Sequence, residues 1–270
     1  MVTAQTRSEI AELLQRYGLA PRHHLGQHFL ADANITRKIV SMARVRPGDR
    51  IIEVGAGTGT LTRALATAGA HVVAYEVDRG LRPVLEEQTE DMDVDLRFED
   101  VMSVDFAVFP ADGESWKLVA NLPYNVGTPF LLDAIQKSPA IELFVVMVQR
   151  EVAERLCAGP GSRDYGLPSV ISQIFTTPHL EFTVPPQVFY PRPRVESAVV
   201  VMERTESPPH AERAVEIAAE AFRQRRKMVR GSLKGTFAEP LDVLQRAGID
   251  PKSRAEELSP SDYLTLAELS

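Results

Sequence analysis

A glycine-rich segment between a predicted strand and a predicted helix constrains the fold of this chain more than any other feature. The apolar run at 51–54 predicts a buried strand, and it leads into Gly55, Gly57 and Gly59 before a helix-like pattern begins. Glycines at such a turn let the backbone approach a ligand closely, and the first turn of a helix has N–H groups without an intrahelical partner. The segment therefore predicts a βα unit with a ligand site at its loop, and a plain tight turn is the alternative.

The next two predicted strands also end in acids. Glu76 ends the strand that begins near His71, and a carboxylate about twenty residues after a glycine-rich loop is where a ribose-binding acid belongs. Asp100 ends the strand that begins near Asp95, and its carboxylate is suited to accept a hydrogen bond from an adenine amine. The alternatives are a solvated strand end for Glu76 and an Asx-type turn or helix cap for Asp100.

The tetrapeptide Asn-Leu-Pro-Tyr at 121–124 directly follows another apolar run, at 117–120, that predicts a buried strand. The Asn121 amide oxygen and the Leu122 carbonyl can both accept hydrogen bonds from one exocyclic NH2 group. The ring of Tyr124 can stack on the base that carries this amine. The pattern therefore indicates a site that holds a planar, amine-bearing ring against a methyl donor, although an ordinary turn has the same residue types.

The glycine spacing separates two classes of cofactor. A dinucleotide fingerprint would place its third glycine at position 60, which is Thr60 here, whereas the third glycine of this chain is Gly59. This spacing, opened by Glu53, is closer to the loop of S-adenosylmethionine enzymes. Ligands of open α/β sheets bind outside the carboxyl ends of the strands. We therefore expect the loop, the two acids and the Asn-Leu-Pro-Tyr segment along one edge of a sheet.

The order of the predicted elements indicates two domains. Strand and helix patterns alternate over residues 49–156, which predicts a parallel sheet with crossover helices. An amphipathic helix is predicted at 6–18, before the first strand. Pro208-Pro209 marks a linker, and the residues beyond it have helical patterns. We predict a Rossmann-like α/β domain at 1–205 and a small helical domain at 206–270.

Composition limits the kind of protein and its compartment. A hydrophobic content of 44% is enough for a packed core, and the single cysteine, Cys157, rules out an internal disulfide and favours a reducing compartment. No apolar run approaches membrane-spanning length and no signal peptide is evident, so a cytoplasmic protein without a membrane partner is expected. His23, His24 and His28 lie close in sequence, but no cysteine or acidic cluster gives metal-ligand spacing, so no metal is expected.

The charge distribution singles out one basic segment. The net charge of −7 is not the basic footprint expected of an RNA-binding protein. Between Phe222 and Lys234, however, six cations occur with no acid among them. Such a run is suited to contact phosphates, and a solvated helix face is the alternative. The predicted RNA-binding residues are Arg223, Arg225, Arg226, Lys227 and Arg230.

Further motifs occur in an order that resembles one family. In addition to the segments above, they are Gly-Gln-His-Phe-Leu at 26–30, residues 149–156, Tyr165-Gly166, Pro185-Pro186 with Phe189, residues 193–200 and the run at 222–233. Over nearly the whole chain, this set resembles the ribosomal RNA adenine N6-dimethyltransferases, the KsgA/Dim1 group. His28 stands where many members have Asn, and Arg192 lies in a proline-rich stretch that varies.

The resemblance implies the Rossmann-like sheet of an S-adenosylmethionine-dependent methyltransferase, with a C-terminal domain that binds RNA or the ribosomal subunit. The implied substrates are two adjacent adenosines near the 3′ end of small-subunit (16S) rRNA, each methylated twice at N6 in an immature small ribosomal subunit. Asn121 and Leu122 would hold the amine, Tyr124 would stack on the base, and Phe189 would close over its other face. The enzyme is expected to act as a monomer. The residues expected to bind the donor are Gln27, His28, Leu30, Glu53, Gly55, Gly57, Glu76, Asp100 and Asn121.

Three other functions stay open. A large-subunit adenine methyltransferase of the macrolide-resistance type would share the strand-end motifs, but the run at 222–233 resembles the small-subunit group. A non-catalytic assembly or transcription factor on the same fold need not keep acids such as Glu76 or the catalytic amide Asn121. A nicotinamide dehydrogenase conflicts with the glycine spacing and with the lack of an evident hydride-transfer acid.

Overall fold

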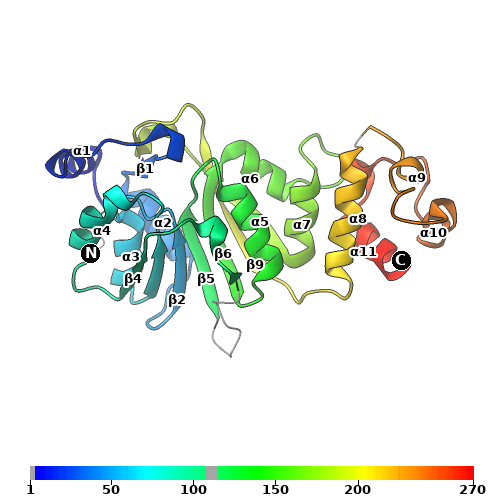
Figure 1. The fold of residues 1–270 in the computed structure, drawn as a ribbon, viewed down its shortest axis with the longest axis horizontal. Helices are drawn as coiled ribbons and strands as arrows, with labels where there is room; N and C mark the ends of the chain where they lie inside the picture. The colour runs from blue at the N-terminus through cyan, green and yellow to red at the C-terminus, as the bar shows by residue number, and fades with distance from the viewer. Residues whose placement is uncertain (1–3, 107–114, 225) are drawn as a thin grey trace. The chain divides into compact units, whose positions relative to one another are not determined.

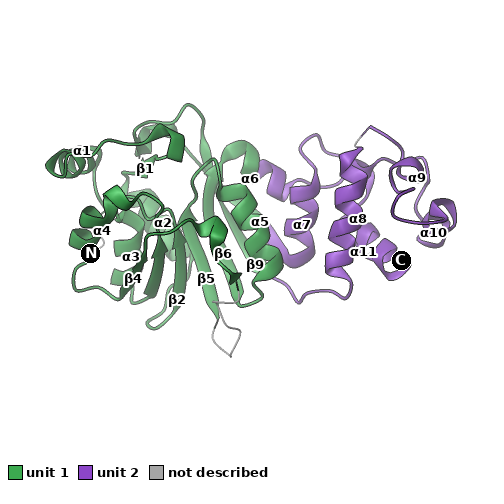
Figure 2. Cartoon of the chain, viewed as in Figure 1, with its two compact units in different colours: residues 1–153, 179–203 green, residues 154–178, 204–270 purple. Residues whose placement is uncertain are grey.

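The computed structural model of the protein describes residues 4–106, 115–224 and 226–270. The chain divides into two compact units, which Figure 2 shows in different colours. The first unit contains the sheet and the second is helical. Their bounds are Met1–Ala153 with His179–Glu203 for the first unit, and Glu154–Pro178 with Arg204–Ser270 for the second.

A seven-stranded sheet forms the centre of the first unit, with the strand order β4-β3-β2-β5-β6-β9-β7 (Figure 1). The strands from β4 to β6 are parallel to their neighbours, whereas β9 runs antiparallel to β6. The parallel part confirms the α/β class predicted from the alternating pattern. The strands are β2 (Arg50–Val54), β3 (His71–Tyr75), β4 (Val94–Arg97), β5 (Trp116–Asn121), β6 (Ile141–Gln149), β7 (Thr176–Val184) and β9 (Ser197–Arg204).

Polar side chains cap the first two helices of the first unit. The helix predicted at 6–18 is α1 (Arg7–Arg16), which starts with a capping box between Thr6 and Glu9. Asp32 caps α2 by accepting hydrogen bonds from the first backbone N–H groups. The helices after α1 are α2 (Ala33–Met42), α3 (Thr60–Thr67), α4 (Arg82–Gln88) and α5 (Gly127–Lys137), with short 3-10 turns η1 (His23–Leu25), η2 (Arg79–Leu81), η3 (Val101–Ser103) and η5 (Pro186–Val188). Helix α6 (Arg150–Cys157) begins in the first unit and ends in the second.

The strand order creates a switch point between β2 and β5. The chain moves from β2 outward to β3 and β4, and then returns to the other side of β2 with β5 and β6. Ligands in open α/β sheets bind at such a point, beyond the carboxyl ends of the strands. The glycine loop follows β2, and the Asn-Leu-Pro-Tyr segment begins at the last residue of β5. The fold thus brings together the two segments that the sequence singled out.

A small antiparallel ribbon of β1 (Phe29–Leu30) and β8 (Phe189–Tyr190) connects two segments that are far apart in sequence. It pairs Phe29 with Tyr190 and Leu30 with Phe189. The ribbon therefore attaches the Gly-Gln-His-Phe-Leu segment to the proline-rich loop before β9.

The helical unit extends beyond the predicted C-terminal domain. Its helix α7 (Leu167–Phe175) contacts α8 (Ala211–Arg223) and α11 (Pro260–Glu268). Residues 154–178 therefore belong to the same compact unit as the C-terminal helices. That residues 206–270 form an RNA-binding domain stays a prediction. The remaining elements are α9 (Val229–Ser232), α10 (Pro240–Arg246) and the 3-10 turn η6 (Ala255–Glu257).

Two kinds of feature are not found in the described parts of the chain. No helix there has both the length and the apolar character needed to cross a membrane. Among the same residues, no group of three or more His, Cys, Asp or Glu side chains could hold a metal ion.

Candidate active site

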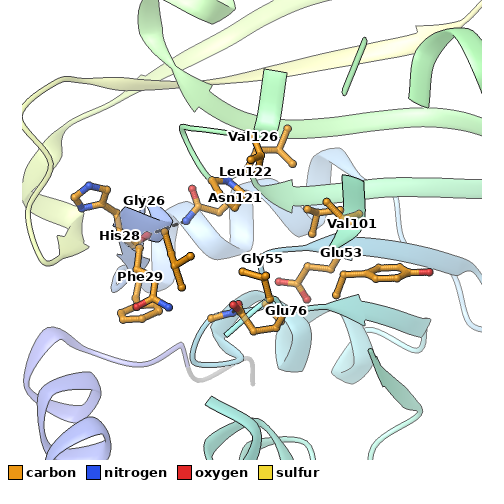
Figure 3. Close-up of a pocket in the computed structure, with 18 of the residues that line it drawn as sticks. Gly26, His28, Phe29, Glu53, Gly55, Glu76, Val101, Asn121, Leu122 and Val126 are labelled. Atoms are coloured by element: carbon orange, nitrogen blue, oxygen red, sulfur yellow. Dashed lines mark hydrogen bonds between the residues drawn. The ribbon is translucent and has the colours of Figure 1, made fainter. Parts of the chain in front are cut away.

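A pocket opens at the carboxyl ends of β2, β3 and β5, as expected for the switch point (Figure 3). All nine residues predicted to bind a methyl donor line it, and so do three of the four predicted catalytic residues, Asn121, Leu122 and Tyr124. The structure thus brings together side chains from five separate sequence segments. Lining residues that the sequence did not single out include Thr58, Thr60, Val77 and Val101.

Two glycines allow the donor loop to pack against neighbouring segments. Gly55 has φ +78°, and a Cβ on it would lie 3.0 Å from the Pro123 side chain. Gly57 has φ +60°, and a Cβ there would lie 2.8 Å from the Phe29 ring. Both backbone conformations favour glycine. The loop therefore contacts the Asn-Leu-Pro-Tyr segment on one side and β1 on the other, which explains why glycine is needed.

Glu76 follows β3 and is 6% exposed. Its Oε2 accepts a hydrogen bond from the Gly57 N–H at 2.9 Å, and its Oε1 accepts one from the Asp78 N–H at 2.9 Å. These bonds fix the orientation of the carboxyl group, and each oxygen keeps acceptor capacity for a ligand. Burial raises the pKa of Glu76, and the backbone hydrogen bonds oppose this rise.

Two other residues predicted to bind the methyl donor, Gln27 and Asp100, accept hydrogen bonds from nearby backbone N–H groups. The Gln27 side chain accepts a hydrogen bond from the Arg22 N–H at 2.7 Å and donates one to Asp78 at 2.9 Å. Its amide therefore helps to build the pocket wall. Asp100 is exposed, lines the pocket and accepts a hydrogen bond from the Met102 N–H at 2.9 Å. Asp100 therefore caps η3, which was the alternative prediction for this residue, and it also lines the pocket.

The orientation of the Asn121 amide is fixed by a backbone carbonyl. Its Nδ2 donates a hydrogen bond to the His28 carbonyl at 3.0 Å (Figure 3). A carbonyl can only accept, so the amide oxygen must be on the opposite side. This oxygen has no partner among the described residues. The Leu122 N–H donates to the Met147 carbonyl at 3.0 Å, which holds the next peptide in place.

Tyr124 is held from two sides. Its hydroxyl lies 2.6 Å from Ser197 Oγ, and its ring centroid lies 5.4 Å from that of His28. Burial raises the pKa of Tyr124, so the phenol stays neutral at physiological pH. His28 Nδ1 lies 2.8 Å from the Pro191 carbonyl and therefore carries the proton. The His28 ring thus lies beside Tyr124 and the proline-rich loop.

Phe189 is the one predicted catalytic residue that does not line the pocket. Its side chain is 0% exposed, and it pairs with Leu30 in the β1–β8 ribbon. Its predicted contact with the substrate base would require this side chain to leave the core. That contact stays a prediction.

Glu53 contributes a buried carboxyl group to the pocket. The residue is 2% exposed, and neither its Oε2 nor the nearby Thr62 hydroxyl has a hydrogen-bond partner among the described residues. Burial is the largest of the effects that raise the pKa of Glu53 to about 8, and the charge of Glu76 acts in the same direction. An unpaired buried acid in a pocket fits a ligand that carries a cationic group.

In the helical unit, the predicted RNA-binding residues are mostly exposed. Arg226, Lys227 and Arg230 are exposed and make no ion pair with other described residues. Arg223 pairs with Glu220 at 3.0 Å. Arg225 lies outside the described residues.

The structure adds two cations to this group. A backbone bridge joins Met228 to Arg254, and the Val229 N–H donates to the Ser253 carbonyl at 2.7 Å. Exposed Lys252 and Arg254 therefore belong to the same surface. The sequence did not single them out because two glutamates, Glu256 and Glu257, lie close after Arg254, and because Arg254 is far from the basic run in sequence. We call Arg226, Lys227, Arg230, Lys252 and Arg254 the basic surface.

Comparison with solved structures supports the fold. The chain superposes on a dimethyladenosine transferase from Plasmodium falciparum with a TM-score of 0.76, at 23% identity over 88% of this chain and 96% of that chain. The 23S rRNA methyltransferase ErmE gives a TM-score of 0.69, at 25% identity over 89% of this chain and 98% of that chain. Both likenesses confirm the methyltransferase fold predicted from the sequence.

Sequence relatives cover almost the whole chain. It is 42% identical to the ribosomal RNA small subunit methyltransferase A of Phenylobacterium zucineum, over 99% of this chain and 94% of that protein. It is 43% identical to the protein of the same name from Nocardia farcinica, over 96% of this chain and 93% of that protein. A family model described as ribosomal RNA adenine dimethylase matches residues 19–270. With its sheet, pocket and strand-end motifs, this chain belongs to the ribosomal RNA adenine dimethylase family.

Proposed function

We propose that this protein uses S-adenosylmethionine to dimethylate N6 of two adjacent adenosines near the 3′ end of small-subunit (16S) rRNA. The observation that carries the proposal is the position of the Asn121 amide. Among the described residues this oxygen has no hydrogen-bond partner, and Asn121 lines the same pocket as the glycine-rich loop and Glu76. Relatives that are 42–43% identical have names that specify the small subunit, whereas the 23S enzyme ErmE is 25% identical. These identities favour the small-subunit substrate.

On the donor side, S-adenosylmethionine supplies an electrophilic methyl group on a sulfonium when it is bound. Glu76 would accept hydrogen bonds from the ribose hydroxyls, because the Gly57 and Asp78 N–H groups already hold its two oxygens in place. Asp100 would accept one from the adenine amine. The buried carboxyl group of Glu53, whose Oε2 has no hydrogen-bond partner among the described residues, would ionise beside a cationic group and stabilise its positive charge.

On the acceptor side, the chain has to position the amine rather than ionise it. The lone pair of an adenine N6 is delocalised into the ring, so the amine is a poor nucleophile. The Asn121 oxygen and the Leu122 carbonyl would accept its two hydrogens and direct the lone pair toward the methyl group. Tyr124 would stack on one face of the base, after the base has left its own stack. Positioning of this kind supplies much of the acceleration.

The helical unit would bind the rRNA. Among the described residues, the cations of the basic surface have no acidic partner, although the net charge of the chain is −7. Phosphate contacts dominate nucleic-acid affinity. We place this function in residues 206–270 and propose that the protein acts as a monomer in the cytoplasm. The substrate is the RNA of an immature small ribosomal subunit.

Glu76→Ala is expected to weaken donor binding. The substitution removes the proposed acceptors for the ribose hydroxyls and leaves the Gly57 and Asp78 N–H groups unpaired. The binding free energy of the donor is expected to weaken by roughly 1–3 kcal/mol, which is the cost of hydrogen-bonding groups left without a partner. Calorimetric titration of the folded variant with S-adenosylmethionine measures it, with the exposed Glu90→Ala as control. An unchanged affinity would rule out Glu76 as a donor ligand.

Reversal of three charges on the basic surface is expected to weaken subunit binding. The triple change Arg226→Glu, Lys227→Glu and Arg230→Glu should lower affinity by roughly tenfold to a hundredfold, and flatten the salt dependence by about one slope unit per lost phosphate contact. Donor affinity should not change. Binding to small subunits is measured across a salt series.

The control for this triple variant makes the same change in net charge elsewhere in the helical unit. Arg155, Arg163 and Arg246 are exposed and lie outside residues 223–234 and 251–254. Their reversal to Glu should leave the salt slope close to that of the unmodified protein. If both triple variants bind alike, the basic surface is only a solvated face.

The proposed function is tested with subunits that lack their methylations. The protein is incubated with labelled methyl donor and either small or large ribosomal subunits, and the RNA is digested to identify the labelled nucleoside. We expect N6,N6-dimethyladenosine from small subunits alone. Label in large-subunit RNA would support the macrolide-resistance type of enzyme. Absence of label with intact subunit binding would support a non-catalytic assembly factor.

A further inference from the structure

We infer that the N-terminal segment clamps the donor loop, and that Gln5 is the residue that positions this loop for the donor. The N-terminal clamp is defined as residues 4–19, which include α1. The inference deepens the proposed function, because it rests on the donor pocket. It assigns a role to a side chain outside that pocket.

Gln5 is 7% exposed and connects the clamp to the loop through hydrogen bonds at both ends of its amide. Its Oε1 accepts hydrogen bonds from the hydroxyls of Thr58, at 2.7 Å, and Thr60, at 2.8 Å. Its Nε2 donates to the Thr58 carbonyl at 3.1 Å and to Gln88 Oε1 at 3.0 Å. Thr58 and Thr60 line the pocket. One side chain outside the pocket thus holds two residues of its wall.

Within the loop the Gly59 N–H donates a hydrogen bond to the Ala56 carbonyl at 2.9 Å, and the contact with Gln5 fixes the threonines on either side of Gly59. Gly59 is the N-cap of α3, with φ +82° and no side-chain cap. Glycine has the greatest conformational freedom in the unfolded or mobile state, and the loop has glycine at alternate positions from Gly55 to Gly59. Glu76 holds the first part of the loop at the Gly57 N–H. Gln5 holds the second part, at the start of α3.

The rest of the clamp is anchored independently of the loop. Ile10, Leu13 and Leu14 of α1 are buried in the core of the first unit. Arg16 forms an ion pair with Glu87 at 2.9 Å, and the Tyr17 hydroxyl donates a hydrogen bond to the same glutamate. The clamp therefore rests on α4 as well as on the core, and Figure 1 shows α1 beside this helix.

Docking of the clamp and binding of the donor should therefore stabilise each other. If the clamp favours the loop conformation that binds the donor, the donor must favour the docked clamp by the same factor. This reciprocity gives two separate measurements. One follows donor affinity when Gln5 is changed, and the other follows the clamp when the donor is added.

The first measurement uses Gln5→Met, which keeps the length of the side chain and removes its hydrogen bonds. We expect the donor Kd and the donor KM to rise on the order of tenfold. At saturating donor, kcat and the KM for the RNA should match the unmodified protein. The control is Gln15→Met, the same change at an exposed position of α1. An unchanged donor Kd in folded Gln5→Met overturns the inference, and so does a fall in kcat with unchanged donor KM.

The second measurement needs no variant. Amide hydrogen exchange of residues 5–18 is followed with and without S-adenosylmethionine in the unmodified protein. We expect the donor to slow exchange there, and the same rates with and without bound donor would overturn the inference even if Gln5→Met did not fold. Failure of the unmodified protein to bind the donor would instead overturn the donor site itself, so the two failures are distinguishable.

Discussion

Asn121→Ala is expected to lower methyl transfer by about a hundredfold or more, because a misplacement of about 1 Å at the reacting centre can cost that much. The change removes the amide oxygen that would direct the target amine. Subunit binding should persist, since phosphate contacts usually dominate affinity and the basic surface is unchanged. Turnover is measured at saturating donor, because Asn121 lies in the donor pocket.

The matched control for this prediction is Asn34→Ala, the same change at an exposed position of α2. A folded Asn121→Ala protein with near-normal turnover would rule out the positioning mechanism. Simultaneous loss of activity and subunit binding would indicate that Asn121 has a structural role. The ordinary turn would then be the better explanation of the Asn-Leu-Pro-Tyr segment.

Glu53→Gln is expected to remove a large pH dependence of stability. Burial raises the pKa of Glu53 from 4.5 to about 8 in the folded protein, whereas the unfolded chain ionises near the ordinary value. Between these two values the folded state binds more protons, so the free energy of unfolding falls as pH rises. The contribution of Glu53 is complete below pH 4.5 and is lost by about pH 8. Its full size is on the order of 5 kcal/mol.

Urea unfolding at a series of pH values measures this effect. The stability of the unmodified protein relative to Glu53→Gln should decrease from pH 5 to pH 9, because glutamine stays neutral throughout. The exposed Glu90→Gln serves as the control for a general change in charge. A constant difference between Glu53→Gln and the unmodified protein across this range would mean that Glu53 is ionised in the folded state.

Local sequence patterns predicted the sheet and most of the pocket. Buried parallel strands such as β2 and β5 are continuous apolar runs, and the residues at their carboxyl ends must meet at one edge of the sheet. The positions of Glu53, Glu76 and Asn121 in one pocket follow from that geometry. These features depend on a parallel sheet with crossover helices, which the alternation of elements predicted.

Features that depend on contacts between distant segments could not be predicted in the same way. Phe189 is buried where it pairs with Leu30 in the β1–β8 ribbon. A strand of two residues is too short for its sequence to have a periodic pattern, so it could not be predicted. The contact of Gln5 with Thr58 spans 53 residues. Arg254 joins the basic surface through backbone contacts of residues 251–254 with residues 228–230. A single amide or cation in sequence gives no indication of such a partner.

The hydrogen bond between Asn121 and the His28 carbonyl has a consequence for inhibition. The peptide segment that would contact the donor also orients the amide that would direct the acceptor. A small molecule that displaces this segment would therefore impair both the donor site and the acceptor site through a single contact. Its kinetic pattern would be mixed with respect to both donor and RNA, whereas a simple analogue of the donor would compete with the donor alone.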